Sequence, residues 1–200
     1  QITVIVDEIG RILEQRLTYG FSMIDSTKFT SWLKDEVEIH VVNRITEGTV
    51  YPRSISFLTN TVAAPVAEAL PKGEKNLYAD AWYDVNDALG VMFKKGYTPI
   101  VCPHKERWKG YYRKKARKLY RNPVNRLGYR QRGRGESPFG SLTNAYGDRM
   151  KTFSIQATKT RTVARILAYQ VRLLIRVTQE LLGIIRHARG NRKVFKLQVL

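Results

Sequence analysis

The first 60 residues change from a helical to a strand-like spacing of apolar side chains. Residues 1–17 repeat apolar positions at helical spacing and predict an amphipathic helix. Three runs that follow, at 21–25, 37–42 and 49–59, predict three strands joined as an antiparallel meander. Pro52 in the third run favours an edge strand, because proline has no N–H to donate to a neighbouring strand.

The middle of the chain alternates between helical and strand patterns. Two helices and two strands are expected, in the order helix 63–70, strand 77–80, helix 85–95 and strand 97–102. Asp84 and Asp87 have the spacing of an N-cap and a third helical residue, so they predict the start of the second of these helices. Because a strand, a helix and a strand in succession pair in parallel, the sheet should be mixed.

A long C-terminal stretch, residues 158–189, repeats apolar residues at helical spacing and predicts one helix packed on the sheet. With 200 residues and 43% hydrophobic side chains, the chain has enough apolar surface for one sizeable core. A membrane span needs about 20 consecutive apolar residues, and four charged residues interrupt the longest apolar region, so a soluble protein is expected. They are Arg165, Arg172, Arg176 and Glu180. The lone Cys102 excludes an internal disulfide and a Cys-rich zinc site, and fits a reducing cytoplasm.

Positive charge is concentrated in one part of the chain, residues 104–134, here called the basic segment. The chain has a net charge of +18, and this segment alone holds thirteen Lys or Arg against one Glu. Aromatic residues interleave with the cations, namely Trp108, Tyr111, Tyr112 and Tyr120. This composition is typical of surfaces that follow a phosphate backbone and stack on bases, so nucleic acid is the first candidate partner and an anionic membrane the second. The plain alternative is a solvated loop.

Three carboxylates stand at positions where they could meet. Asp25 and Asp80 each follow an apolar strand, and Glu136 begins a predicted helix just after the basic segment. Acids at the ends of neighbouring strands, joined by one from a helix, can hold the two divalent ions of phosphoryl transfer. Each acid also has a purely structural interpretation, in which Asp25 caps a turn, Asp80 starts a loop and Glu136 favours a helix N-terminus.

The spacing Tyr129-x2-Arg132-x3-Glu136 resembles the Y-x2-R-x3-E-x6-K signature of bacterial and archaeal insertion-sequence transposases, which have a DDE triad and an RNase H-like fold. Other segments are similar to further motifs of that family in the same order, at 24–27, 79–84 and 96–100. The resemblance implies an α/β, RNase H-like mixed sheet flanked by helices, with the basic segment as an insertion and a long C-terminal helix. It divides the chain into a residual N-terminal helix, 1–17, and a catalytic domain, 18–200.

The resemblance also implies a function: metal-dependent cleavage at transposon ends and strand transfer into target DNA. Asp25, Asp80 and Glu136 would be catalytic and bind Mg²⁺ or Mn²⁺, as two ions. Arg132 and Tyr129 would position phosphates, because the planar guanidinium matches phosphate oxygens. Further DNA contacts are expected from the basic segment, at Arg113, Lys114, Lys115, Arg117, Lys118 and Arg134. A homodimer on DNA, in the nucleoid of a prokaryotic cytoplasm, would be the working state.

The sequence departs from the signature at one position, where Thr143 stands in place of the lysine. The chain also starts at Gln1 rather than Met, as a fragment would, and the family's N-terminal DNA-binding helices are missing or reduced. These features favour an alternative, a catalytically inactive transposase remnant that only binds DNA. A structural RNA-binding protein, such as a ribosome-associated one, would explain the charge but not the ordered acidic motifs. Gly133 and Gly135 predict a flexible approach to Glu136.

Overall fold

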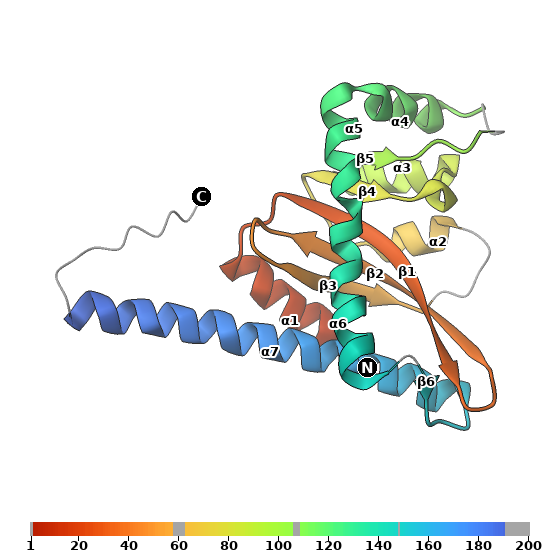
Figure 1. Cartoon of the computed structure of the whole chain (residues 1–200). Coiled ribbons are helices and arrows are strands. Elements are labelled where there is room, and N and C mark those ends of the chain that lie inside the picture. The colour runs from red at the N-terminus through yellow and green to blue at the C-terminus, as the bar shows by residue number, and fades with distance from the viewer. Residues whose placement is uncertain (1, 58–62, 106–108, 148, 191–200) are drawn as a thin grey trace.

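A mixed β-sheet forms the centre of the molecule in the computed structural model, which describes residues 2–57, 63–105, 109–147 and 149–190 (Figure 1). The strands are β1 (Phe21–Ser31), β2 (Glu36–Ile45), β3 (Val50–Ser56), β4 (Asn76–Ala79), β5 (Thr98–Val101) and the short β6 (Arg149–Met150). The order across the sheet is β3-β2-β1-β4-β5, with β6 paired to β1. β1, β2 and β3 are antiparallel neighbours, whereas β4 runs parallel to β1 and β5 parallel to β4. The predicted meander followed by parallel strands is therefore confirmed.

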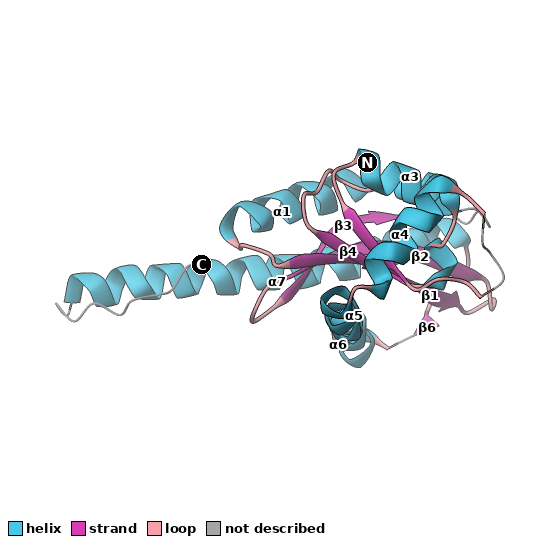
Figure 2. Ribbon diagram, turned by 90° about the horizontal axis from the view of Figure 1, so that it is seen from above, coloured by secondary structure: helices cyan, strands magenta, loops and turns pink. Residues whose placement is uncertain are grey.

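Helices cover both faces of this sheet. They are α1 (Ile2–Arg16), α2 (Ala63–Glu68), α3 (Asn86–Lys94), α4 (Tyr111–Arg121), α5 (Pro123–Tyr129), α6 (Ser137–Tyr146) and α7 (Ile155–Gly190), with two 3₁₀ helices, η1 (Ala81–Tyr83) and η2 (Arg130–Glu136). Seen along the sheet, α5 and α6 lie on one side and α1 and α3 on the other (Figure 2). No helix in the described part of the chain is both long and apolar enough to cross a membrane.

The alternation of side chains along the strands decides which residues each layer buries. On one face of the sheet, Ile24 and Val42 pack in a core with residues of α2 and α3, such as Leu89. Phe29 and Ile39 point to the opposite face and pack against α6 and α7. Since successive residues of a strand point to opposite faces, Asp25 shares the second face with Met23 and Phe29.

α1 packs along the sheet edge formed by β3 and against α7. Its Leu13 is fully buried in a cluster with Tyr51 of β3 and Leu173 of α7. Gly10 permits this close approach, because an added Cβ would lie 2.4 Å from the carbonyl oxygen of Arg53. Pro52 lies in the edge strand β3, as its missing N–H predicts.

Within its described residues the basic segment is largely helical, which the sequence pattern did not predict. α5, η2 and α6 follow one another as a single rod that crosses the face of the sheet (Figure 1). The rod touches the strands through glycines, since Gly128 lies against Tyr78 and Gly135 against Met23. Trp108 and the end of the third predicted strand, residues 58–59, lie outside the described residues.

Two local predictions are wrong. Asp84 does not cap α3, whose N-cap is Val85 without a side-chain hydrogen bond. The Asp84 carboxylate is instead buried and accepts a hydrogen bond from the backbone N–H of His104 at 2.8 Å. Gly135 is not a flexible link, because its carbonyl accepts a hydrogen bond from Asn43 at 3.0 Å and an added Cβ would lie 2.5 Å from Met23 Cε. Both residues are held by tertiary contacts that local spacing does not reveal.

Candidate active site

The parallel pairing of β1 with β4 aligns two carboxylates. Its register pairs Ser22 with Leu77 and Met23 with Tyr78, an offset of 55 residues. The same offset aligns Asp25 with Asp80, one residue beyond the end of β4. Asp25 and Asp80 lie two residues after Met23 and Tyr78, which are paired in this register. Since residues two apart in a strand share a face, both acids point to the sheet face that the rod crosses.

Each of the two aspartates is also held by its local backbone. Asp25 is buried, and its Oδ1 accepts a hydrogen bond from the Ser26 backbone N–H at 3.0 Å. Asp80 is half-buried and is the N-cap of η1, where its Oδ1 accepts from the Trp82 N–H at 3.0 Å. Asp25 lies within β1 rather than at a strand end or in a turn, so the expected turn role is wrong for it. The expected role of Asp80 at the start of a loop is present, as the N-cap of η1.

Arg132 of η2 supplies the positive charge beside this pair. Its Nη2 lies 3.5 Å from Asp25 Oδ1, and Tyr129 is a neighbour that influences its pKa. Burial lowers the pKa of Arg132, but Tyr129 and the charges of Asp25 and Asp80 outweigh this effect and raise it. Tyr129 is itself fixed by edge-to-face contacts with Tyr78 and Tyr120.

The environment of Asp80 disfavours its charged form. Burial raises the pKa of its carboxyl, the nearby charge of Asp25 raises it further, and Arg132 and the Trp82 N–H partly oppose the shift. A cation nearby stabilises the charged forms of two carboxylates that repel each other in a partly buried place. In the described structure that cation is Arg132.

Glu136, the third predicted acid, is exposed and does not join the pair. Within the described residues, no three Asp, Glu, His or Cys side chains are close enough to share a metal ion. The winding of η2 explains this. In an α-helix, Arg132 and Glu136 would lie about 40° apart around the axis, whereas 3₁₀ winding separates them by about 120°.

Two of the three predicted ligands therefore fit a divalent ion in this structure. Asp25 and Asp80 offer hard carboxylate oxygens from adjacent strands, the donor type that Mg²⁺ and Mn²⁺ prefer. Glu136 does not fit with η2 wound as it is here. With η2 in its 3₁₀ winding, the three acids do not form a shared ion site among the described residues.

Several predicted DNA contacts have partners inside the protein. Arg113 pairs with the buried Asp84 at 3.3 Å and donates twice to its carbonyl oxygen, at 3.1 and 2.7 Å. Arg117 donates to the carbonyl of His104 at 3.0 Å and lies 4.0 Å from Asp84 Oδ2. Arg134 donates to the carbonyls of Thr46 and Glu47 in the β2–β3 turn. Of the α4 cations predicted to bind DNA, those that remain exposed are Lys114, Lys115 and Lys118.

Sequence reasoning missed two groups of residues around this site. Met23 and Asn43 support η2 from the sheet through Gly135, and only the tertiary structure pairs them. Arg172 and Arg176 of α7 line a cavity beside α6. They are four residues apart on a helix, a spacing that puts them on one face and was readable from the sequence.

A mixed sheet that begins with an antiparallel meander, continues in parallel strands and aligns two carboxylates at its centre defines an RNase H-like domain. Comparison with protein families agrees with this fold class and also identifies the family. The chain belongs to the transposase DDE domain family, whose model matches residues 59–171. That range contains Asp80, Arg132 and Glu136, while Asp25 precedes it. No curated protein and no solved structure matches the chain.

Proposed function

We propose that this domain catalyses metal-dependent cleavage of DNA at transposon ends and transfer of the freed strand into target DNA. The observation that carries the proposal is the alignment of Asp25 with Asp80, with Arg132 against them. Family membership supports the class of reaction, since a transposase acts on DNA. The place of action would be the nucleoid of a prokaryotic cell, with a homodimer on the DNA.

In this proposal Asp25 and Asp80 hold Mg²⁺ or Mn²⁺, and Glu136 completes a second ion site. The ions, when bound, supply activation of a water or a 3′ hydroxyl and stabilisation of the leaving oxygen. The protein supplies rigidity, because both aspartates are held by backbone N–H groups. Arg132 supplies a planar donor at the entrance to the acid pair, where its guanidinium can bind phosphate oxygens in two places at once.

A second candidate function is a DNA-binding remnant without catalysis. Two observations favour it: Glu136 is exposed, away from the acid pair, and Thr143 on α6 offers no charge where the signature has its lysine. The two functions differ in one measurable property. Only the nuclease loses an activity when divalent ions are chelated.

The test is Asp80→Asn, which keeps the size and the capping oxygen of the side chain but removes its charge. Nicking of supercoiled DNA that carries the sequences flanking the coding region should be lost in Mg²⁺ or Mn²⁺. DNA affinity should stay within a few fold of the wild-type value, because the variant has one negative charge fewer to repel the phosphates. The matched control is Asp87→Asn, an exposed acid on α3, which should leave nicking unchanged.

Full nicking by a folded Asp80→Asn protein would exclude Asp80 as a metal ligand. Wild-type protein that binds the same DNA tightly but never nicks it, at any Mg²⁺ or Mn²⁺ concentration, would support the remnant. Nicking that persists in EDTA would contradict metal dependence altogether.

A further inference from the structure

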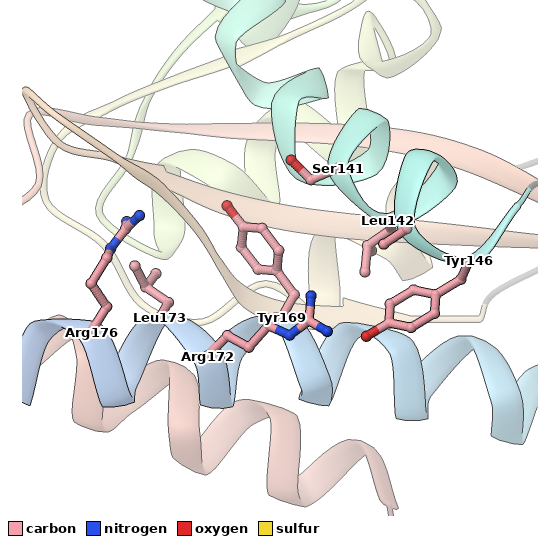
Figure 3. A pocket seen from close by; sticks show the side chains of 8 residues that line it. Ser141, Leu142, Tyr146, Tyr169, Arg172, Leu173 and Arg176 are labelled. Atoms are coloured by element: carbon pink, nitrogen blue, oxygen red, sulfur yellow. The ribbon is translucent and has the colours of Figure 1, made fainter.

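A cavity of about 300 Å³ lies between α6 and α7, away from the acid pair of the candidate active site. From α6, Tyr146 points toward α7, and from α7, Tyr169 rises toward α6, while Arg176 lies farther along α7 (Figure 3). Ser141 and Arg172 also line it. We call this cavity the α6–α7 groove.

The chemistry of the groove is basic and aromatic. The Arg172 guanidinium lies 5.8 Å from the centre of the Tyr146 ring, and no carboxylate among the described residues pairs with it. Arg176 has one carboxylate neighbour, Glu180, at 4.0 Å, and both side chains are more than 60% exposed. An ion pair of that length and exposure contributes little, so both arginines retain their capacity to bind an anion.

The walls of the groove are held by contacts that leave these arginines exposed. The Tyr169 hydroxyl donates to the carbonyl of Val50 at 2.9 Å, which fixes the ring against β3. Arg165 donates to the carbonyls of Tyr146 and Gly147, so it closes the C-terminal end of α6 rather than facing a ligand. The groove is therefore formed before any ligand binds.

The groove lies close to the β2–β3 turn, which is also contacted by the rod that carries Arg132. Arg134, in η2 near Arg132, donates to the carbonyls of Thr46 and Glu47 in the β2–β3 turn, and Arg176 donates to Thr49 at the other end of that turn. α6 itself contains no charged residue. The cations beside α6 thus come from α7, one helical turn apart and on the same face.

We propose that the α6–α7 groove is a second DNA-binding site, in which Arg172 and Arg176 hold the phosphate backbone and Tyr146 and Tyr169 line the path of the sugars and bases. Its ligand class rests on the proposed function, which makes DNA the partner. The charge supports a polyanion, because both arginines are exposed and the chain carries +18 overall. Phosphate recognition suits arginine, and aromatic rings accept bases of any sequence.

The experiment compares two double variants of α7 that remove the same charge. Arg172→Gln with Arg176→Gln changes the groove. Lys159→Gln with Arg161→Gln changes two cations nearer the start of the same helix that do not line it. Binding of a labelled duplex of mixed sequence is followed by fluorescence anisotropy in EDTA over a range of NaCl concentrations, and circular dichroism confirms that both variants are folded.

The groove variant should lower the slope of log affinity against log salt by about 1 to 2, since each phosphate contact contributes about 0.9. The control should lower it by less than half as much. Equal losses in the two variants, or an unchanged slope in the groove variant, would overturn the proposal. Because the measurement needs no metal and no cleavage, it is independent of the nicking test. Wild-type protein that never nicks DNA would contradict the catalytic function and would leave DNA binding in the groove standing.

Discussion

At the scale of single residues, several arginines pair with buried or half-buried acids inside the protein. Asp84 has Arg113 as its closest cation, and Asp25 has Arg132. Glu14 of α1 binds two arginines of the sheet, Arg44 and Arg53, at 2.8 Å each. Removing one member of such a buried pair costs about 3 to 5 kcal/mol, because the other is left charged and unpaired. Arg44, Arg53 and Arg113 therefore hold the fold together, and exposed lysines are better candidates than these arginines for contacts with DNA.

Asp7 of α1 predicts a pH-dependent stability. One of its carboxylate oxygens is buried without a hydrogen-bond partner in the described structure, and burial raises its pKa, although Arg53 partly opposes this. A carboxyl with a raised folded-state pKa contributes stability that is fully present below its unfolded pKa and is lost as the pH rises through the folded value. Asp7→Asn should therefore raise the Tm at about pH 7, with a gain that shrinks toward about pH 4.

Thermal melts across this pH range measure the effect of Asp7→Asn. The control is Glu8→Gln, at an exposed neighbour whose pKa is lowered by its hydrogen bond with Arg11, so that loss of its charge should not stabilise the protein. A Tm difference for Asp7→Asn that stays the same at every pH would show that the ionisation of Asp7 is not its cause.

At the scale of elements, η2 is the unusual part of the molecule. It has seven residues in 3₁₀ winding between two α-helices, whereas such runs seldom exceed three or four residues and often mark a hinge. It contains two glycines, which weaken α-helical winding. Because Tyr129, Arg132 and Glu136 share one face only in an α-helix, the winding of η2 decides whether Glu136 faces the acid pair.

Gly133→Ala should favour α-helical winding of η2. An added Cβ at Gly133 meets nothing within 4 Å, and alanine is about 1 kcal/mol more favourable than glycine inside a helix. If rewinding brings Glu136 to the aspartates, half-maximal nicking should need several-fold less Mn²⁺. Gly140→Ala on α6 is the control, since that site is equally open but lies outside η2. The same Mn²⁺ requirement in both variants would show that winding of η2 does not limit metal binding.

At the scale of the whole molecule, two of the surfaces with exposed cations lie on different elements. One is the exposed side of α4 in the basic segment, with Lys114, Lys115 and Lys118, and the other is the α6–α7 groove. α5, η2 and α6 run between them in a continuous rod (Figure 1). A DNA molecule that lies along this rod would pass the acid pair, which lies under η2.

Replacing Lys114, Lys115 and Lys118 together by Ala tests the α4 surface. The slope of log affinity against log salt should fall by about 2 to 3, because three phosphate contacts of about 0.9 each are removed. The unfolding free energy should change little, as exposed lysines contribute little to stability. The control is Arg113→Ala, which should chiefly destabilise the fold because Asp84 loses its closest cation. An unchanged slope in the triple variant would show that DNA does not contact α4.

The sequence predicted those features of the fold that depend on residues close together in the chain. Apolar spacing along the chain determined the type and order of the main helices and strands, and hence the mixed sheet, because strand and helix periods are properties of neighbouring residues. It did not predict the helices of the basic segment, although Tyr112, Ala116 and Leu119 recur at helical spacing in α4. The motif around Glu136 indicated the family, which the match over residues 59–171 confirms.

Tertiary structure decided what the sequence could not. Asp25 and Asp80 are 55 residues apart, and only the parallel register of β1 and β4 aligns them. The spacing of cationic residues in the sequence does not show which of them pair inside the protein. Only the packing shows that Arg113 pairs with Asp84 while Lys114 is exposed. Gly135 at the end of η2 packs on Met23 and bonds Asn43, which lie 112 (135 − 23) and 92 positions away in the chain. Contacts between residues so far apart in the chain leave no periodic pattern in the sequence. Each such contact occurs only once and depends on how two particular surfaces fit together.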